Sequence, residues 1–511
     1  MVFGLALVEV LSLLAVCLYL QTSTLSGAYP MFLPVASASA IALCCLVAFY
    51  YNELYNLRMV RSYGEFVPRL IRSILAVLIV AAVFHMLFPR AGIDNDLFLT
   101  LVTVAALILW IRAGFYILLA RGLLNQRVLI LGKGPLAYRI AEEIERAPHL
   151  RYTTLGFVDD SPETSEIQEP APELGGYRIL GRMEQLSKII DSLRPNRIVV
   201  ALTERRGRLP VWKLLDSSVN GVPVEDGIEV YERLTGKVAL ESLAPSSIVF
   251  SSDFRKSRWR LGVIRTLNIL ASFVGIVLLA PVLFLVAVAI KLDSSGPVFF
   301  IQKRLGLRNK SFSLIKFRTM HATRGRRTSE WAEDNKARLT RIGPWLRKYR
   351  FDELPQLFNV LWGHMSLIGP RPHPVSNHEL FLENISYYPL RAVIRPGITG
   401  WAQVRYGYAN NLEEEREKMR YDLHYIKRMS FYMDFQILLD TVKCVLFGSE
   451  SLLRQREQTP PTRAYPASVS PYPTATFWEP PASTRYSSHF REGRPLDVSS
   501  QRAATKPSTL L

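Results

Sequence analysis

Four long apolar runs occupy the first quarter of the 511-residue chain. They cover roughly residues 3–20, 31–51, 69–88 and 97–120, and each is about long enough to cross the hydrocarbon core of a bilayer as a helix. The connection between the first two runs is uncharged, whereas basic residues follow the second and the fourth, which places both ends of the bundle in the cytoplasm. We therefore expect four transmembrane helices over residues 1–122; a buried bundle in a soluble protein is the alternative.

An α/β pattern follows these runs. Short apolar segments at 127–131, 154–159 and 197–202 predict buried strands, and a helical repeat separates the first two. The pattern predicts a Rossmann-like α/β domain over residues 126–250.

The turn after the first of these strands is rich in glycine but lacks part of the dinucleotide-binding fingerprint. It runs from Gly132 to Ala137, and Ala137 stands where the third glycine belongs. Asp159 or Asp160 lies roughly where an acid that binds a ribose would stand. A structural, accessory domain is the favoured interpretation, with nucleotide binding as the alternative.

A fifth apolar run, near residues 266–290, has strongly basic flanks on both sides. Because positive flanks favour the cytoplasmic face, a straight span would violate the preference at one end. Pro281 lies near the middle and interrupts helical hydrogen bonding. We expect a bent, re-entrant helix that enters and leaves by the same leaflet, with a kinked full span as the alternative.

The composition indicates that this membrane-associated chain also binds an anionic partner. The chain is 49% hydrophobic yet has 62 Lys and Arg against 44 Asp and Glu, a formal net charge of +18. Anionic lipid, phosphorylated substrates and nucleic acid would all fit this charge, but no base-reading motif is present, so we expect no nucleic acid. Residues 455–511 are rich in Pro, Ser and Thr without apolar periodicity and predict a disordered tail.

The candidate chemistry centres on two adjacent carboxylates, Asp352 and Glu353. Their place before an apolar helical repeat makes Asp352 a candidate N-cap, with Glu353 in the first turn. Arg347 and Arg350 precede the pair, and cations beside carboxylates lower their pKa values and keep them ionised. An ionised carboxylate can act as a nucleophile or hold a divalent cation, and the cations can neutralise a diphosphate.

Five motifs in this region resemble the signature of the bacterial sugar transferases, the monotopic polyprenyl-phosphate glycosyl-1-phosphate transferases. They occur in order at residues 303–306, 312–320, 352–361, 365–372 and 395–404. The resemblance covers about 260–450, and the preceding spans and α/β segment are similar to the long form of exopolysaccharide-initiating members. The segment from Tyr421 to Lys427 resembles most the exosortase-associated subgroup.

This resemblance implies a mainly helical monotopic catalytic domain on the cytoplasmic face of the bacterial inner membrane. It also implies a ping-pong reaction in which Asp352 attacks the β-phosphate of a UDP-sugar and releases UMP. Polyprenyl (undecaprenyl) phosphate then accepts the sugar-phosphate from the carboxylate, the first membrane step of exopolysaccharide biosynthesis. Long-form members are expected to be able to form homodimers.

The resemblance also implies roles for individual residues. Asp352 and Glu353 are the catalytic residues and hold Mg²⁺, which the family requires. The residues expected to bind substrate phosphates or to lie near the membrane surface are Lys303, Arg304, Lys316, Arg318, Arg347 and Arg371.

Two positions have alternative interpretations. His364 stands where family members usually carry an acid, so it either alters the metal site or occupies a tolerant surface helix end. Trp401 either stacks on a sugar or base or packs into its turn.

Two other classes of protein compete with the transferase hypothesis. A non-catalytic scaffold of polysaccharide assembly is the first, and the intact Asp352–Glu353 pair argues against it. A membrane-anchored NAD-dependent nucleotide-sugar dehydratase is the second. It requires a complete glycine fingerprint and a Tyr-x-x-x-Lys motif, and the central segment shows neither.

Overall fold

A computed structural model describes most of the chain between residues 2 and 447. The described residues are 2–25, 32–55, 63–87, 96–120, 125–147, 151–159, 176–202, 209–240, 248, 253–254, 256–321, 338–407, 409 and 411–447. The predicted tail at 455–511 and Asp160 lie outside them.

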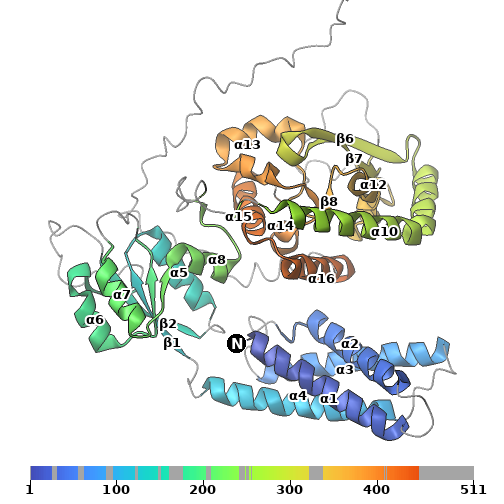
Figure 1. The fold of residues 1–511 in the computed structure, drawn as a ribbon. Helices are drawn as coiled ribbons and strands as arrows, with labels where there is room; N and C mark the ends of the chain where they lie inside the picture. Colours follow the sequence, from blue (N-terminus) through green and yellow to red (C-terminus); the bar gives the residue numbers. More distant parts are fainter. Residues whose placement is uncertain are drawn as a thin grey trace, which may run out of the picture. The chain divides into compact units, whose positions relative to one another are not determined.

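Each of the four N-terminal apolar runs forms a helix, and the four pack into one bundle (Figure 1). The helices are α1 (Val2–Leu25), α2 (Phe32–Tyr51), α3 (Tyr63–Leu87) and α4 (Asp96–Ala120). Residues such as Leu13, Phe49, Phe66 and Ile108 are almost fully buried between them. Apolar side chains on the outer surface, including Trp110 at 75% exposure, leave the bundle with an apolar exterior.

An ion pair lies inside this bundle. Arg112 on α4 is fully buried and donates from Nη2 to Glu9 Oε2 on α1, at 3.1 Å. The same nitrogen donates to the carbonyl of Leu54 in the turn after α2, also at 3.1 Å. The guanidinium lies 4.9 Å from the centre of the Phe66 ring. One arginine thus ties four segments of the bundle together.

The central domain is a five-stranded parallel sheet with helices on both faces, which confirms the predicted α/β fold. Its strand order is β3-β2-β1-β4-β5. Helices α5 and α8 cover one face and α6 and α7 the other (Figure 1). The bounds are β1 (Gln126–Leu131), α5 (Pro135–Arg146), β2 (Tyr152–Asp159), β3 (Ile179–Arg182), α6 (Leu186–Leu193), β4 (Arg197–Val200), α7 (Val211–Val219), β5 (Val224–Asp226) and α8 (Gly227–Thr235).

Other residues of this domain pack closely against its glycine-rich turn. Gly132 has φ +106°, and a Cβ there would lie 2.7 Å from the carbonyl oxygen of Ala201. Lys133 Nζ lies 3.0 Å from Asp159 Oδ2, so the acid that could have bound a ribose already has a cationic partner. This arrangement favours the structural interpretation of the domain.

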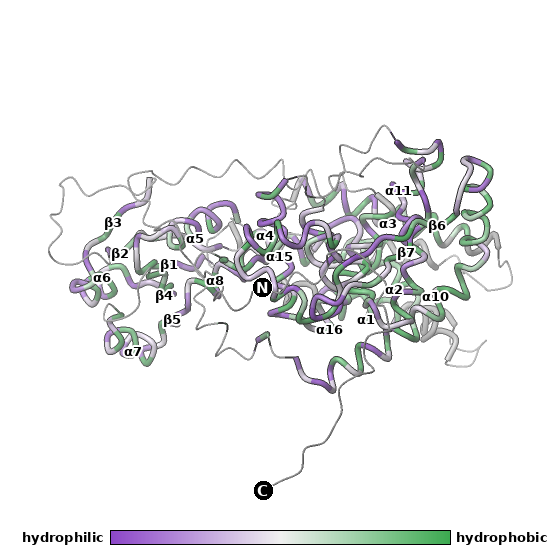
Figure 2. Tube along the Cα trace, turned by 90° about the horizontal axis from the view of Figure 1, so that it is seen from above, coloured by the Kyte–Doolittle hydropathy of each residue, from purple (hydrophilic) through white to green (hydrophobic). Residues whose placement is uncertain are grey.

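The fifth apolar run lies within one helix, α10 (Arg258–Asp293), with Pro281 inside it. Figure 1 shows two straight arms of this helix joined by a sharp turn, which proline explains because it removes a backbone hydrogen bond. Its hydrophobic residues appear green in Figure 2. Among the described residues, α10 alone is long and apolar enough to cross a membrane, by length and composition, and shorter apolar helical stretches occur at Val8–Tyr19, Ser39–Tyr51 and Val102–Leu118.

The remaining elements form a mainly helical unit with two small sheets. The pair β6–β7 is antiparallel, and β8–β9 is parallel. The bounds are β6 (Phe299–Leu305), β7 (Ser311–Phe317), α11 (Gly343–Lys348), α12 (Gln356–Leu361), β8 (Ser366–Ile368), α13 (His378–Asn384), β9 (Gly397–Thr399), α14 (Trp401–Arg405), α15 (Leu412–Arg428) and α16 (Phe431–Phe447). Its core includes Phe381, Leu423, Ile426 and Ile437.

The buried ion pair of the bundle yields a stability prediction. Arg112→Met leaves the Glu9 carboxylate buried without its partner, which costs about 3–5 kcal/mol in comparable cases. We expect the thermal unfolding midpoint of the purified protein in detergent to fall in this variant. The double variant Glu9→Leu, Arg112→Met removes both charges and should recover most of the loss. Equal midpoints for the single and double variants would show that the pair does not stabilise the bundle.

Candidate functional site

The two carboxylates lie in a short 3₁₀ turn, η7 (Phe351–Glu353), rather than at a helix N-cap. Arg350 has a left-handed backbone conformation with φ 59°, which turns the chain sharply before the pair. Helix α12 begins only at Gln356, after Pro355, so the prediction that Asp352 caps it was wrong. The helix ends at Leu361, and Gly363, with φ +88°, follows its C-cap Trp362. Asp352 and Glu353 are 8% and 6% exposed.

Three cations converge on one oxygen of Glu353. Arg371 Nη2 lies 2.7 Å from Glu353 Oε1, and Lys316 Nζ lies 3.3 Å from it. Arg350 Nη1 lies 3.6 Å from the same oxygen. The structure thus brings Lys316 and Arg371, two of the predicted phosphate-binding residues, to the carboxylate pair.

The two carboxylates differ in protonation equilibrium. Burial alone would raise the pKa of Glu353, but Arg371, Lys316 and Arg350 together hold this pKa well below its ordinary value. Burial raises the pKa of Asp352, the charge of Glu353 raises it further, and the same three cations only partly oppose this. The expectation that cations lower both pKa values therefore holds for Glu353 and was wrong for Asp352, because burial outweighs the cations there.

The lysine at the site is also perturbed. Burial lowers the pKa of Lys316 to about 8, although the charge of Glu353 acts in the opposite direction. Close to neutral pH this side chain is therefore near the point where it loses its charge.

A buried asparagine fixes the distance between the lysine and the carboxylates. Asn359 on α12 donates from Nδ2 to the carbonyl of Ser313, at 2.8 Å, and its Oδ1 accepts from the backbone N–H of Ile315, at 3.0 Å. These bonds attach α12 to β7, the strand that carries Lys316. Sequence reasoning did not single out Asn359 because its partners lie more than 40 residues away.

The loop that carries Arg371 is held from behind. It follows β8, and Gly397 on the paired strand β9 donates to the carbonyl of Pro370 at 3.0 Å. Arg391 Nη2 donates to the carbonyl of Arg371 at 2.8 Å, and Arg391 Nε lies 2.7 Å from Asp422 Oδ2.

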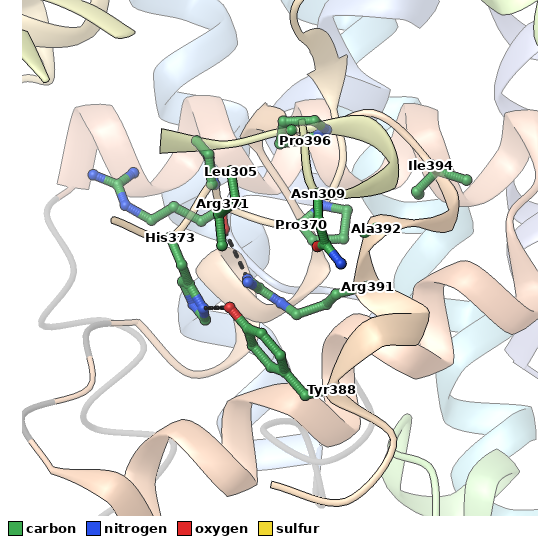
Figure 3. Close-up of a pocket in the computed structure, with 12 residues that line it drawn as sticks. Leu305, Asn309, Pro370, Arg371, His373, Tyr388, Arg391, Ala392, Ile394 and Pro396 are labelled. Atoms are coloured by element: carbon green, nitrogen blue, oxygen red, sulfur yellow. Dashed lines mark hydrogen bonds between the residues drawn. The ribbon is translucent and has the colours of Figure 1, made fainter. Parts of the chain in front are cut away.

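A small pocket lies behind the same loop, and Leu305, Asn309 and Arg391 are among its lining residues. In Figure 3 the Arg371 side chain points away from this pocket, while the Arg391 guanidinium reaches the Arg371 carbonyl. Sequence reasoning also missed Arg391 and Asp422. Because Arg391 donates to the Arg371 carbonyl and pairs with Asp422, these two residues position Arg371. Among the described residues, neither of them forms a hydrogen bond or ion pair with Asp352 or Glu353.

Three of the four other predicted phosphate ligands form no ion pair with the carboxylates among the described residues, whereas Arg304 is close enough to Lys316 for its charge to lower the pKa of that lysine. Arg318 is 5% exposed and donates to the carbonyls of Ser294 and Ser295 at the end of α10, both at 2.8 Å. Arg304 donates to the carbonyl of Pro372, at 3.1 Å. Arg347 Nε donates to Thr319 Oγ1, at 3.0 Å. Lys303 is exposed on β6.

The carboxylate pair could hold Mg²⁺ only if a bound substrate supplied further ligands. Among the described residues, no group of three or more His, Cys, Asp or Glu side chains could hold a metal. Within the same residues the Asp352 carboxylate has no hydrogen bond or ion pair, and Glu353 Oε1 faces cations. Mg²⁺ commonly binds through one or two carboxylates completed by substrate phosphates. Asp352 and Glu353 fit that mode and do not form an all-protein cage.

The two ambiguous positions take the packing interpretation. The exposed His364 stacks on Phe312, with ring centres 5.7 Å apart, at the turn after α12. Trp401 is 9% exposed and donates from Nε1 to the carbonyl of Gly236 at 2.9 Å. The Arg405 guanidinium lies 4.4 Å from the centre of its ring. Trp401 therefore does not offer its face to a sugar.

Comparison with family models gives two matches. Residues 259–448 match the bacterial sugar transferase family. Residues 50–209 match a family described as CoA-binding domain, which overlaps the central sheet. The first match contains the carboxylate pair and all the cations around it.

Individual relatives align with between about a third and two thirds of this chain. A UDP-N-acetylgalactosamine-undecaprenyl-phosphate N-acetylgalactosaminephosphotransferase of Aeromonas hydrophila is 40% identical over 227 residues, 44% of this chain and 53% of the relative. An undecaprenyl-phosphate glucose phosphotransferase of Komagataeibacter xylinus is 33% identical over 346 residues, 64% of this chain and 60% of the relative. The chain thus spans little more than half the length of these two.

A third relative is covered more completely. It is a UDP-glucose:undecaprenyl-phosphate glucose-1-phosphate transferase of Caulobacter vibrioides, 42% identical over 184 residues, which are 36% of this chain and 69% of the relative. Its coverage and identity, together with the family match over the carboxylate pair, confirm the predicted resemblance: the chain belongs to the bacterial sugar transferase family.

Proposed function

We propose that the protein transfers a sugar-1-phosphate from a UDP-sugar to polyprenyl phosphate. The single observation that carries this proposal is the buried Asp352–Glu353 pair with three cations beside it. Phosphoryl transfer requires a nucleophile and positive charge around the phosphates, and little further protein chemistry. The names of the three relatives describe sugar phosphotransferases that act with undecaprenyl phosphate, and two of the names include a UDP-sugar.

The proposed reaction has two steps, each a nucleophilic displacement at phosphorus. An oxygen of ionised Asp352 attacks the β-phosphorus of the donor, the bond from that phosphorus to the bridging oxygen breaks, and UMP leaves with the electron pair. An acyl phosphate on Asp352 now carries the sugar. A phosphate oxygen of the lipid then attacks the same phosphorus, the bond to Asp352 breaks, and the carboxylate is regenerated.

The cations of the site support both displacements. Lys316, Arg350 and Arg371 balance the charge of Glu353 before the donor binds, and their remaining hydrogen-bond donors can contact the diphosphate and stabilise charge that develops on it. Mg²⁺ bound to Asp352 and Glu353 would add positive charge at the phosphates. Because three cations surround the single carboxylate of Glu353, the site can accept an anionic donor.

The membrane arrangement suits a soluble donor and a lipid acceptor. We propose that α1–α4 span the inner membrane and that the two arms of α10 enter and leave from the cytoplasmic side. Exposed apolar residues on both arms support this, among them Phe273 and Leu278 before Pro281 and Phe284 after it, at 59%, 72% and 68% exposure. A role in exopolysaccharide initiation and a homodimeric state are part of the same proposal.

The transfer reaction predicts donor- and lipid-dependent release of UMP. The purified full-length protein, with Mg²⁺ and undecaprenyl phosphate, should release UMP from at least one UDP-sugar. Asp352→Asn removes the nucleophile and should reduce the rate on the order of 10³-fold or more. Glu413→Gln, which alters a 78% exposed carboxylate side chain on α15, is the matched control and should retain the rate. Absence of UMP release from a panel of UDP-sugars by folded protein would contradict the proposal.

The perturbed pKa values predict a bell-shaped pH profile. In kcat/KM, which reports the free enzyme, activity should fall with decreasing pH through the raised pKa of Asp352, because the nucleophile becomes protonated. Activity should also fall with rising pH near 8, because Lys316 loses its charge.

Lys316→Arg tests the alkaline limb separately. Arginine stays charged at these pH values, so this variant should lose the decline near pH 8. Lys303→Arg makes the same exchange at an exposed position on β6 and should keep it. If kcat/KM of Lys316→Arg still declined at the same pH, the decline would belong to the titration of another group.

A further inference from the structure

Two arginines meet at the carboxyl end of α12, away from the carboxylate pair. Arg265, on the first arm of α10, donates to the carbonyls of Val360 and Leu361, the latter at 2.8 Å. Arg395 Nε donates to the carbonyl of Gly363, at 2.9 Å. The two guanidinium groups thus contact carbonyls within four consecutive residues. Burial and the neighbouring charge of Arg395 lower the pKa of Arg265, as expected for two close cations.

The positive charge at this place exceeds what the helix end can balance. The carbonyl end of a helix carries about half a negative charge, against two full positive charges here. Neither arginine forms an ion pair with a carboxylate among the described residues, and the two terminal nitrogens of Arg395 have no acceptor among them. His364, next in the chain after Gly363, supplies no negative charge. An external anion would satisfy these donors.

The surroundings indicate that this anion is part of a lipid. Trp362, between the carbonyls that the arginines contact, is 60% exposed. Leu267 and Leu270, within two turns of Arg265 on α10, are 51% and 59% exposed. Exposed tryptophan and leucine beside basic groups are typical of the level of lipid headgroups. The arginines therefore lie where an apolar surface meets charge.

We propose that Arg265 and Arg395 form a binding site for the phosphate of a lipid monophosphate, separate from the Asp352–Glu353 pair. A phosphate monoester carries close to two negative charges and three terminal oxygens, which match two guanidinium groups better than the single charge of a phosphodiester does. The site goes beyond the proposed transfer reaction, since occupancy requires no chemistry at Asp352. It would retain a lipid phosphate beside α10.

Direct lipid binding tests this site. Native mass spectrometry of the full-length protein in detergent would measure binding of undecaprenyl phosphate, with phosphatidylglycerol as the phosphodiester and inorganic phosphate as the free anion. We expect Arg395→Gln to weaken undecaprenyl phosphate binding by about 10-fold or more, as loss of a charge-assisted contact predicts. UMP release by the unaltered protein tests the transfer reaction separately, so failure of this site and failure of that reaction are distinguishable.

A second pair of variants leaves both arginines in place. His364→Asp adds a carboxylate next to Gly363 that competes with the ligand, and we expect weaker lipid binding. His364→Asn is the matched neutral control and should retain it. Unchanged binding in both Arg395→Gln and His364→Asp would overturn the proposal. Equal or tighter binding of phosphatidylglycerol or inorganic phosphate by the unaltered protein would overturn the assignment to a lipid monophosphate.

Discussion

The catalytic region depends on the balance of charge at one oxygen, Glu353 Oε1. Three cations reach it from β7, from the turn before η7 and from the loop after β8. A buried carboxylate without partners would be strongly destabilising, so these three segments must stay together for Glu353 to remain charged. The fold secures them with Asn359 between α12 and β7 and with Arg391 behind the Arg371 loop. The position of Asp352, one residue away, follows from this arrangement.

Much of the fold could be predicted from apolar periodicity. The strands at β1, β2 and β4 and the bent helix at Pro281 follow from local sequence. The motif residues Lys316, Asp352, Glu353 and Arg371 also meet in space. Sequence reasoning located this site because the chemistry required carboxylates and cations that the motifs supply within a short stretch of chain.

Most of the errors and omissions share a physical cause, because they depended on contacts distant in sequence. Arg318 stands two residues after Lys316, yet it turns back to cap the end of α10. Cations near Asp352 were visible in the sequence, whereas its burial was not, and burial raises its pKa. Arg112 lies within an apolar run, and only its buried partner Glu9 on α1 explains how a charge is tolerated there. The displaced helix start has a local cause instead, the left-handed backbone conformation at Arg350.

The central claim is that Asp352 carries the sugar-phosphate covalently between donor and lipid, and the most direct measurement is the mass of the peptide that contains it. Purified protein incubated with its UDP-sugar and Mg²⁺ in the absence of polyprenyl phosphate, then digested at acidic pH, should contain Asp352 increased in mass by one sugar-phosphate. Addition of polyprenyl phosphate before digestion should remove the added mass. Turnover to the lipid product with an unmodified Asp352 peptide at every time point, in single-turnover conditions, would contradict the account.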